Sequence, residues 1–291
     1  MVAVSLNKTV DDIFSGYSKL ETPDERKENK VEGGLFFDGF EELMKQYEEG
    51  IGLGLVPWNN DFKKIISEVN SVLSPRQINN FLQATIKYEN YHNYDWNTGF
   101  FITRLIQNSH DAENNKFTLN TKALSKDING IGYKLKGRGN NVLEIIVDGD
   151  AGHGCGYEAE NIGKLHIAGN VGDSFGYMAE NIKEIYIGGN TGNDCCCCDK
   201  NIGQIYIGGD VGGYCSEYAR NIKGLYIGGT AGLCCGRGGK NSTFKSSNKE
   251  TLRLLKKNVP IGEGNKIYSI QPNGKEKRIG RLMEILNYRL W

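Results

Sequence analysis

Apolar and polar positions in the middle of the chain follow a pattern that repeats every 20 residues. Five units of this length run from Asn141 to Lys240, and each carries two apolar residues separated by one position. Every second side chain of a strand points to the same side, so these positions predict one inward face per unit. The inward pairs are Ile145 and Val147, Leu165 and Ile167, Ile185 and Ile187, Ile205 and Ile207, and Leu225 and Ile227. A fixed period of this length is typical of a solenoid, in which equivalent residues stack coil upon coil.

Asparagine and glycine occupy fixed columns of the repeat. Asparagine opens every unit, which suits a turn with left-handed dihedral angles and an amide ladder between coils. Glycine marks the corners, as at Gly189, and predicts backbone that has positive φ or no room for a Cβ atom. Gly203, in contrast, lies in a column that also holds Leu143 and Lys183, so we expect a larger residue to be tolerated there.

The fullest units follow the glycine pattern G-x-x-G-x-x-x-G. It occurs at Gly149, Gly152 and Gly156, at Gly169, Gly172 and Gly176, and at Gly229, Gly232 and Gly236. The pattern resembles the glycine-repeat β-helix that is found at the C-terminal end of the glutamate synthase large subunit and in one of the subunits of formylmethanofuran dehydrogenase. The resemblance covers residues 141–240, and Cys196 and Ser216 replace the last glycine of two units. It implies a structural role, such as that of a non-catalytic subunit that spaces and docks other parts, and it transfers no catalytic residue.

The N-terminal third has helical periodicity instead. Apolar residues three and four positions apart predict helices over about 9–17, 38–49, 60–73, 74–86 and 96–108. Ser74, Pro75 and Gln77 form the capping-box start of the fourth helix. We therefore expect a helical domain over residues 1–115. An irregular capping and connecting coil over 116–140 is expected to cover the open end of the first repeat.

The period ends after Lys240, and residues 241–291 form a basic segment. This segment has 11 basic and 4 acidic residues, a net charge of +7, whereas the whole chain is neutral with 35 of each sign. Its pattern predicts a short helix over 249–258, a hairpin-like piece at Tyr268 and Ile270, and a final helix over 275–288. Nucleic-acid binding through these charges is a weak alternative, because charges spread along helices are usually solvated.

Together the patterns predict an α+β multidomain chain. Its parts are an N-terminal helical domain, a five-coil single-stranded β-helix (β-solenoid) over 141–240, and a C-terminal helical cap. No apolar stretch has the length of a spanning helix, and the N-terminus lacks the hydrophobic centre of a signal peptide. We therefore expect a cytoplasmic protein without a membrane partner.

All eight cysteines lie inside the repeat. One column contains four of them and a phenylalanine, which indicates an inward column of reduced thiols, with no cofactor. This column consists of Cys155, Phe175, Cys195, Cys215 and Cys235. The alternative is a zinc or iron–sulfur site with the ligands Cys195, Cys197, Cys215 and Cys235. Strand alternation argues against such a site, because it would point Cys196 and Cys198 away from Cys195 and Cys197.

Tyrosines fill the outward column between the two inward positions, at Tyr186, Tyr206 and Tyr226. Such a wall either stabilises the sheet by stacking or offers a docking surface for a protein partner. The sequence contains no phosphate-binding loop, catalytic triad or paired-carboxylate motif. The leading hypothesis is a non-catalytic scaffold that works by contact with a protein partner or with further copies of itself. A metal or iron–sulfur redox protein is the alternative from a different class.

Overall fold

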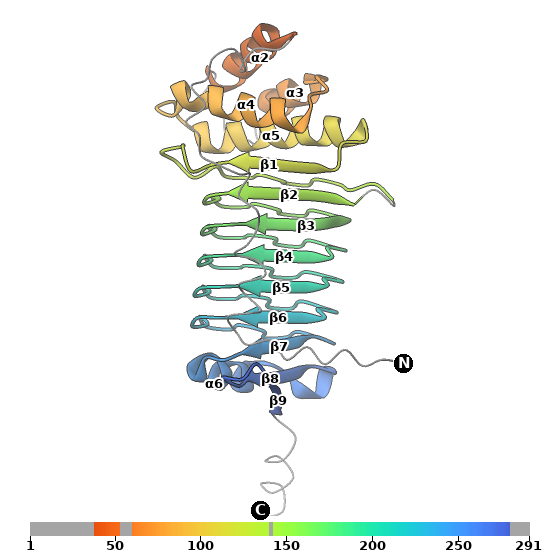
Figure 1. Cartoon of the computed structure of the whole chain (residues 1–291), viewed down its shortest axis with the longest axis vertical. Helices are drawn as coiled ribbons and strands as arrows, with labels where there is room; N and C mark the ends of the chain where they lie inside the picture. The colour runs from red at the N-terminus through yellow and green to blue at the C-terminus, as the bar shows by residue number, and fades with distance from the viewer. Residues whose placement is uncertain (1–37, 53–59, 140–141, 280–291) are drawn as a thin grey trace, which may run out of the picture.

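The structure is a computed structural model, and it describes residues 38–52, 60–139 and 142–279. Nine strands form one sheet in which strand order follows chain order, from β1 to β9. Figure 1 shows these strands lying one after another along the long axis, with helices α2 to α5 at one end and α6 at the other. All neighbouring strands are parallel except β8 and β9. The chain is thus a mixed α/β protein with an open, mostly parallel sheet.

The elements have the following bounds. The strands are β1 (Lys116–Asn120), β2 (Leu143–Asp148), β3 (Ile162–Ile167), β4 (Glu184–Ile187), β5 (Gln204–Ile207), β6 (Gly224–Ile227), β7 (Thr243–Ser246), β8 (Lys266–Ile270) and β9 (Glu276–Ile279). The helices are α2 (Phe40–Gly52), α3 (Asn60–Glu68), α4 (Pro75–Ala84), α5 (Tyr94–Asp111) and α6 (Lys249–Asn258), with short 3-10 helices at Thr85–Tyr88 and Ile261–Glu263. The helix predicted over 9–17 lies outside the described residues.

Strands β3 to β6 pair in a register of 20 residues. Ile185, for example, lies between Leu165 and Ile205. Two further lines of parallel bridges follow the same step, one from Ala151 to Ala231 and one from Glu160 to Lys240. Equivalent positions of the five units therefore lie above one another along three lines.

The predicted inward face is confirmed. The ten inward residues of the repeat are all buried, with at most 2 % of their surface exposed. Phe117 and Leu119 of β1 pair with Ile145 and Val147, so the inward columns continue into the segment before the repeat. Residues 116–140, predicted to be irregular, thus contain the first strand of the sheet.

The predicted asparagine ladder is also present. The Nδ2 of Asn201 donates to the Oδ1 of Asn181 over 3.1 Å, and the Nδ2 of Asn221 donates to the Oδ1 of Asn201 over 2.9 Å. Both Asn181 and Asn201 have left-handed backbones, with φ of 58° and 56°. The amide groups therefore satisfy one another from unit to unit at a corner where a β-branched residue would be strained.

Helix α4 covers the open edge of β1. The Oδ1 of Asn79 accepts the N–H of Asn120 over 2.8 Å, and the Nε2 of Gln83 donates to the carbonyl of Asn120 over 2.7 Å. The predicted capping box starts this helix, because Ser74 and Gln77 each bind the other's backbone N–H. Side chains of a helix thus provide the hydrogen bonds that a further strand would have made at this end of the sheet.

The C-terminal end corrects one prediction. The helix predicted over 249–258 exists as α6, and the hairpin-like piece exists as β8 paired with β9. The final helix is predicted to begin near Lys275, but residues 276–279 are strand β9. Gly274, with a φ of 75°, closes a tight turn that returns the chain against β8, so this segment makes its hydrogen bonds in the sheet. The remainder of that predicted helix lies outside the described residues.

A second correction concerns Gly203. A Cβ atom at this position would clash with the carbonyl oxygen of Lys183, and one at Gly189 would lie 2.9 Å from the carbonyl oxygen of Gly169. Both positions therefore exclude a side chain, although only Gly189 belongs to an all-glycine column.

Within the described part of the chain, none of the helices combines the length and the apolar character needed to cross a membrane.

Candidate functional site

Each unit has a tight turn between its second and third lines of bridges. We call these turns the turn edge, which comprises residues 153–158, 173–178, 193–198, 213–218 and 233–238. Their backbone N–H groups donate to the neighbouring units. Met178 donates to the carbonyl of Cys197 over 2.9 Å in the next unit, and Gly176 donates to the carbonyl of Cys155 over 2.8 Å in the preceding one. Side chains of one column consequently project from the turn edge one above another.

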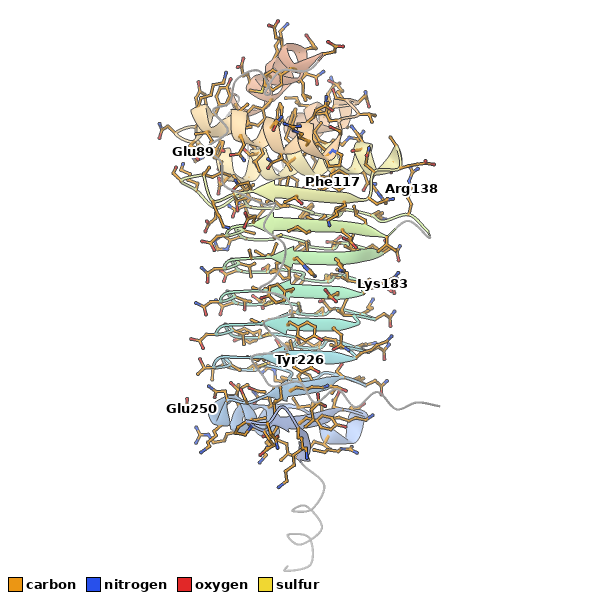
Figure 2. All side chains as sticks on the ribbon, in the orientation of Figure 1. Glu89, Phe117, Arg138, Lys183, Tyr226 and Glu250 are labelled. Carbon is orange, nitrogen blue, oxygen red and sulfur yellow. The ribbon has the colours of Figure 1, made fainter. Side chains whose placement is uncertain are left out.

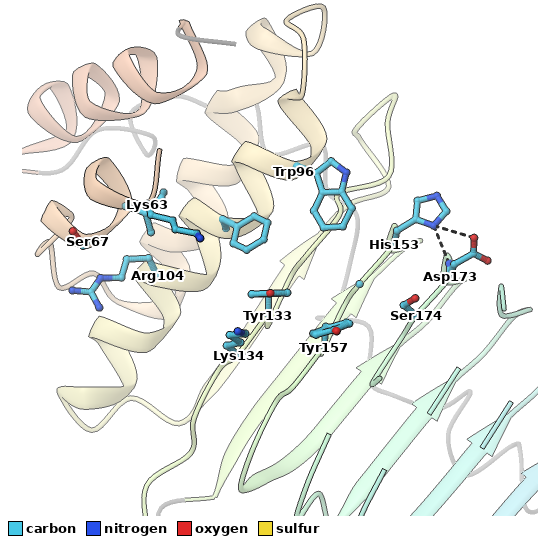
Figure 3. Close-up of a pocket in the computed structure, with 13 residues that line it drawn as sticks. Lys63, Ser67, Trp96, Arg104, Tyr133, Lys134, His153, Tyr157, Asp173 and Ser174 are labelled. Atoms are coloured by element: carbon cyan, nitrogen blue, oxygen red, sulfur yellow. Dashed lines mark hydrogen bonds and ion pairs between the residues drawn. The ribbon is translucent and has the colours of Figure 1, made fainter. Parts of the chain in front are cut away.

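Near the helices, the turn edge forms one wall of a groove of about 730 Å³. The opposite wall is one face of α5, with Trp96, Phe100 and Arg104 at intervals of four residues, and α3 contributes Lys63. In Figure 3, Tyr133 and Tyr157 lie on consecutive turns with their rings parallel, and Trp96 lies nearer to His153 with its ring turned across theirs. The groove therefore lies where the helices meet the first turns.

Aromatic rings continue from this groove along the turn edge. Phe100 and Tyr133 have ring centroids 4.8 Å apart, Tyr133 and Tyr157 are stacked at 5.3 Å, and Tyr157 and Tyr177 at 5.2 Å. The interplanar angles of the two tyrosine pairs are 17° and 14°, which is the geometry of offset stacking. The ladder thus links α5 to the first two units of the repeat.

Farther from the helices, the turn edge exposes large apolar side chains. The exposed fractions are 50 % for Met178, 42 % for Tyr214, 53 % for Tyr218 and 73 % for Leu233. The Arg237 guanidinium lies 5.9 Å from the centre of the Tyr214 ring and forms an ion pair with Glu217. Apolar residues and one ion pair therefore share the same part of the turn edge.

The predicted cysteine column is buried. Cys155, Cys195, Cys215 and Cys235 have no exposed surface, and all eight cysteines are free thiols. Burial raises the pKa of the Cys155 thiol to about 12. This thiol is therefore neutral at physiological pH, as the packing hypothesis predicts.

The fourth proposed metal ligand, Cys197, lies apart from this column. Its Sγ is 3.6 Å from that of Cys198, while Cys195 and Cys196 form a separate pair at 3.8 Å. The side-chain directions predicted for Cys196 and Cys198 from strand alternation are wrong, because Asp194, Cys196 and Cys198 have positive φ and the segment is a turn. In the described part of the chain, no three His, Cys, Asp or Glu side chains are grouped to hold a metal ion.

One buried acid accompanies the thiols. Asp199 has no exposed surface; its Oδ1 accepts the N–H of Ala179 over 2.9 Å, and its Oδ2 has no hydrogen-bond partner of normal geometry. Burial raises the pKa of this carboxyl well above its usual range. Burial therefore favours the neutral form of Asp199, which lies at a column that holds alanine in the units on either side.

The predicted tyrosine wall is largely covered. Tyr186 and Tyr226 are only 7 % and 8 % exposed, and Tyr206 is half-buried. Tyr206 and Tyr226 stack with centroids 4.7 Å apart, and the Lys245 Nζ donates to the Tyr226 hydroxyl over 2.7 Å. Figure 2 shows Tyr226 on the side of the molecule that the strands form. This geometry supports stacking within the sheet more than docking.

Sequence reasoning missed the turn edge, although one signal was present. The column of Met178, Cys198 and Tyr218 places apolar residues in turns, where polar residues are usual. The groove gave no such signal, because its walls come from segments far apart in the chain, and the aromatic string around Trp96 is equally typical of helix packing.

Comparison with known proteins gave no match to a family model, to a curated protein or to a solved structure.

Proposed function

We propose that the chain is a non-catalytic scaffold, built as a single-stranded β-solenoid, that works by protein–protein contact through its turn edge. A second copy of the chain is the partner. The observation that carries this proposal is the exposure of Met178, Tyr214, Tyr218 and Leu233, each at least 42 % open to solvent. Exposed large apolar side chains on one edge of a protein are typical of interaction sites.

The solenoid part of the proposal rests on the three lines of parallel pairing that share the 20-residue step. The glycine pattern that resembles the β-helix of glutamate synthase supports it as well. A stack of this kind fixes the spacing of surface residues along its length, because every unit repeats the same rise. Such a framework suits a spacer that presents one edge to a partner.

Charge favours a second copy as the partner. Glu217 is buried and already forms an ion pair with Arg237 of the same chain, so this pair leaves no net charge to oppose a second copy at the exposed part of the turn edge. The chain has a formal net charge of zero, and two copies therefore approach without long-range repulsion. Tyr214 and Tyr218 beside this ion pair supply the aromatic anchors that are enriched at interfaces.

Sedimentation equilibrium of the full chain tests the proposal. We expect twice the chain mass of 32.3 kDa at about 100 µM and dissociation on dilution. The double variant Tyr214→Ser, Tyr218→Ser should remain folded by circular dichroism and sediment as a monomer. Tyr91→Ser is the matched control, since Tyr91 is 48 % exposed but lies between helices, and it should leave the dimer intact. A monomeric wild type, or a dimer that survives the double variant, would overturn the proposal.

A further inference from the structure

Two consecutive thiols lie together at the turn edge, apart from the buried cysteine column. The Sγ atoms of Cys197 and Cys198 are 3.6 Å apart. Cys198 has a left-handed backbone, with a φ of 62°, and the two side chains converge instead of pointing to opposite sides as they would in a strand. Cys197 is 4 % exposed and Cys198 is half-buried, so solvent reaches the pair from the side of Cys198.

The geometry of this pair favours binding of one metal ion over a disulfide. Consecutive Cα atoms are about 3.8 Å apart, whereas those of a disulfide are usually about 4.4–6.8 Å apart, so a disulfide between chain neighbours is strained. Two thiolates that share one metal at about 2.3 Å, with a bond angle of about 110–120°, have their sulfurs about 3.8–4.0 Å apart. The observed separation of 3.6 Å is close to this value, so a small movement of the side chains completes the chelate.

A thioether lies beside the two thiols. Met178 occupies the column of Cys198 in the preceding unit, and its N–H donates to the carbonyl of Cys197 over 2.9 Å. Because paired chains of this kind are about 4.8 Å apart, the Met178 side chain starts next to that of Cys198. Methionine is unbranched and flexible, and Met178 is 50 % exposed, so its sulfur is able to turn toward the pair.

The ligand types decide which metal fits. Structural zinc sites use four Cys, His or carboxylate ligands, and among the described residues no third side chain of these kinds joins the pair. Soft thiolate and thioether ligands select monovalent copper. On the helix side of the pair lies Tyr177, whose hydroxyl has a raised pKa because the thiols of Cys198 and Cys197 are close to it. Its ring is stacked on that of Tyr157, so this flank of the pair is aromatic and not a further hard ligand.

We propose that Cys197, Cys198 and Met178 bind one monovalent copper ion at the turn edge. The two thiols release their protons to water and bind as thiolates, and the Met178 thioether supplies the third sulfur. All three ligands come from one chain, so the site does not depend on the proposed second copy.

Anaerobic titration of the full chain with Cu(I), in competition with the chelator bathocuproine disulfonate, tests the site. We expect the double variant Cys197→Ser, Cys198→Ser to bind one copper ion fewer than the wild type. Met178→Leu should weaken binding of this ion by at least about tenfold, because one of three ligands is lost. Cys234→Ser is the matched control, since Cys234 is also a half-buried thiol of the turn edge, and it should bind copper as the wild type does.

X-ray absorption at the copper edge identifies the ligands, and thermal midpoints confirm that each variant is folded. We expect three sulfur ligands in the wild type and two in Met178→Leu. An absence of binding, or binding that the double variant retains in full, would overturn the site. Unchanged affinity in Met178→Leu would overturn the third ligand, and zinc bound as tightly as copper would overturn the choice of metal. The titration uses about 1 µM chain, where the proposed dimer is dissociated, and the dimer is measured by mass, so failure of either proposal is visible without the other.

Discussion

Replacing Asp199 with alanine should stabilise the protein at neutral pH. The equivalent positions of the neighbouring units are Ala179 and Ala219, both fully buried, so alanine fits the column. The substitution removes a carboxyl oxygen that is buried without a partner, which costs about 1–3 kcal/mol in the wild type. It loses one hydrogen bond from the Ala179 N–H, worth about 1 kcal/mol, but this N–H also donates to the carbonyl of Gly176 over 2.9 Å. We expect a net gain of about 1–2 kcal/mol at pH 7.

The gain should depend on pH with a definite sign. Burial raises the pKa of Asp199 above the unfolded value of about 3.9, so the folded chain keeps a proton that the unfolded chain releases. The contribution of the protonated acid is fully present below about pH 4 and is lost as the pH rises through the folded pKa. Asp199→Ala should therefore show its largest advantage near pH 8 and a smaller one near pH 4, where only the cost of the unpartnered oxygen remains.

Urea unfolding at several pH values, followed by far-ultraviolet circular dichroism, measures this difference. Midpoints are compared, because repeat arrays can unfold in stages. Asp210→Asn is the control: Asp210 is exposed, hydrogen bonds from Thr230 lower its pKa, and asparagine fills the same column in two other units. That variant should lower the midpoint slightly near pH 8 and should not raise it, because the lowered pKa means that the ionised carboxylate stabilises the folded chain. An Asp199→Ala midpoint below the wild type at pH 8, or a difference independent of pH, would refute the reasoning.

Three further outcomes are expected. Ile187→Asp should cost at least about 3 kcal/mol, because it buries a charge at a fully enclosed position, whereas Ile187→Val should cost about 1 kcal/mol; equal thermal midpoints would contradict the inward assignment. Gly203→Val should be as destabilising as Gly189→Val in the same assay, since both side chains would meet the backbone of the preceding unit. Fluorescence anisotropy at physiological ionic strength should detect no binding to single- or double-stranded nucleic acid. Micromolar binding that is lost on changing Lys256 and Lys257 to glutamate would contradict this expectation.

The sequence predicted those features that depend on one position recurring in every unit. The inward columns, such as Ile187, and the amide ladder, such as Asn201, follow directly from the 20-residue period. The capping box at Ser74 could be predicted because it needs only local residue types. In each of these cases the physical cause lies within a few residues or within one column.

Features that depend on backbone conformation or on distant segments could not be predicted. The backbone is left-handed at Cys196 and Cys198, although neither residue is glycine, so the sequence gives no sign of it. Their side chains therefore do not follow strand alternation. The column of Gly203 accepts lysine in two units, yet the local backbone here leaves no room for a Cβ atom. The groove joins Lys63 to Tyr157, and only the packing of the helices on the first turns brings them together.

The central claim is that the exposed turn edge is covered by a second copy of the chain. Hydroxyl-radical footprinting with mass spectrometry tests it most directly, at about 1 µM and at about 100 µM protein. At the higher concentration we expect oxidation of Met178, Tyr214 and Tyr218 to fall markedly, while oxidation of Tyr91, similarly exposed between the helices, stays constant. Unchanged oxidation of the three turn-edge residues at a concentration where the sedimenting mass has doubled would contradict the claim, because the copies would then meet elsewhere.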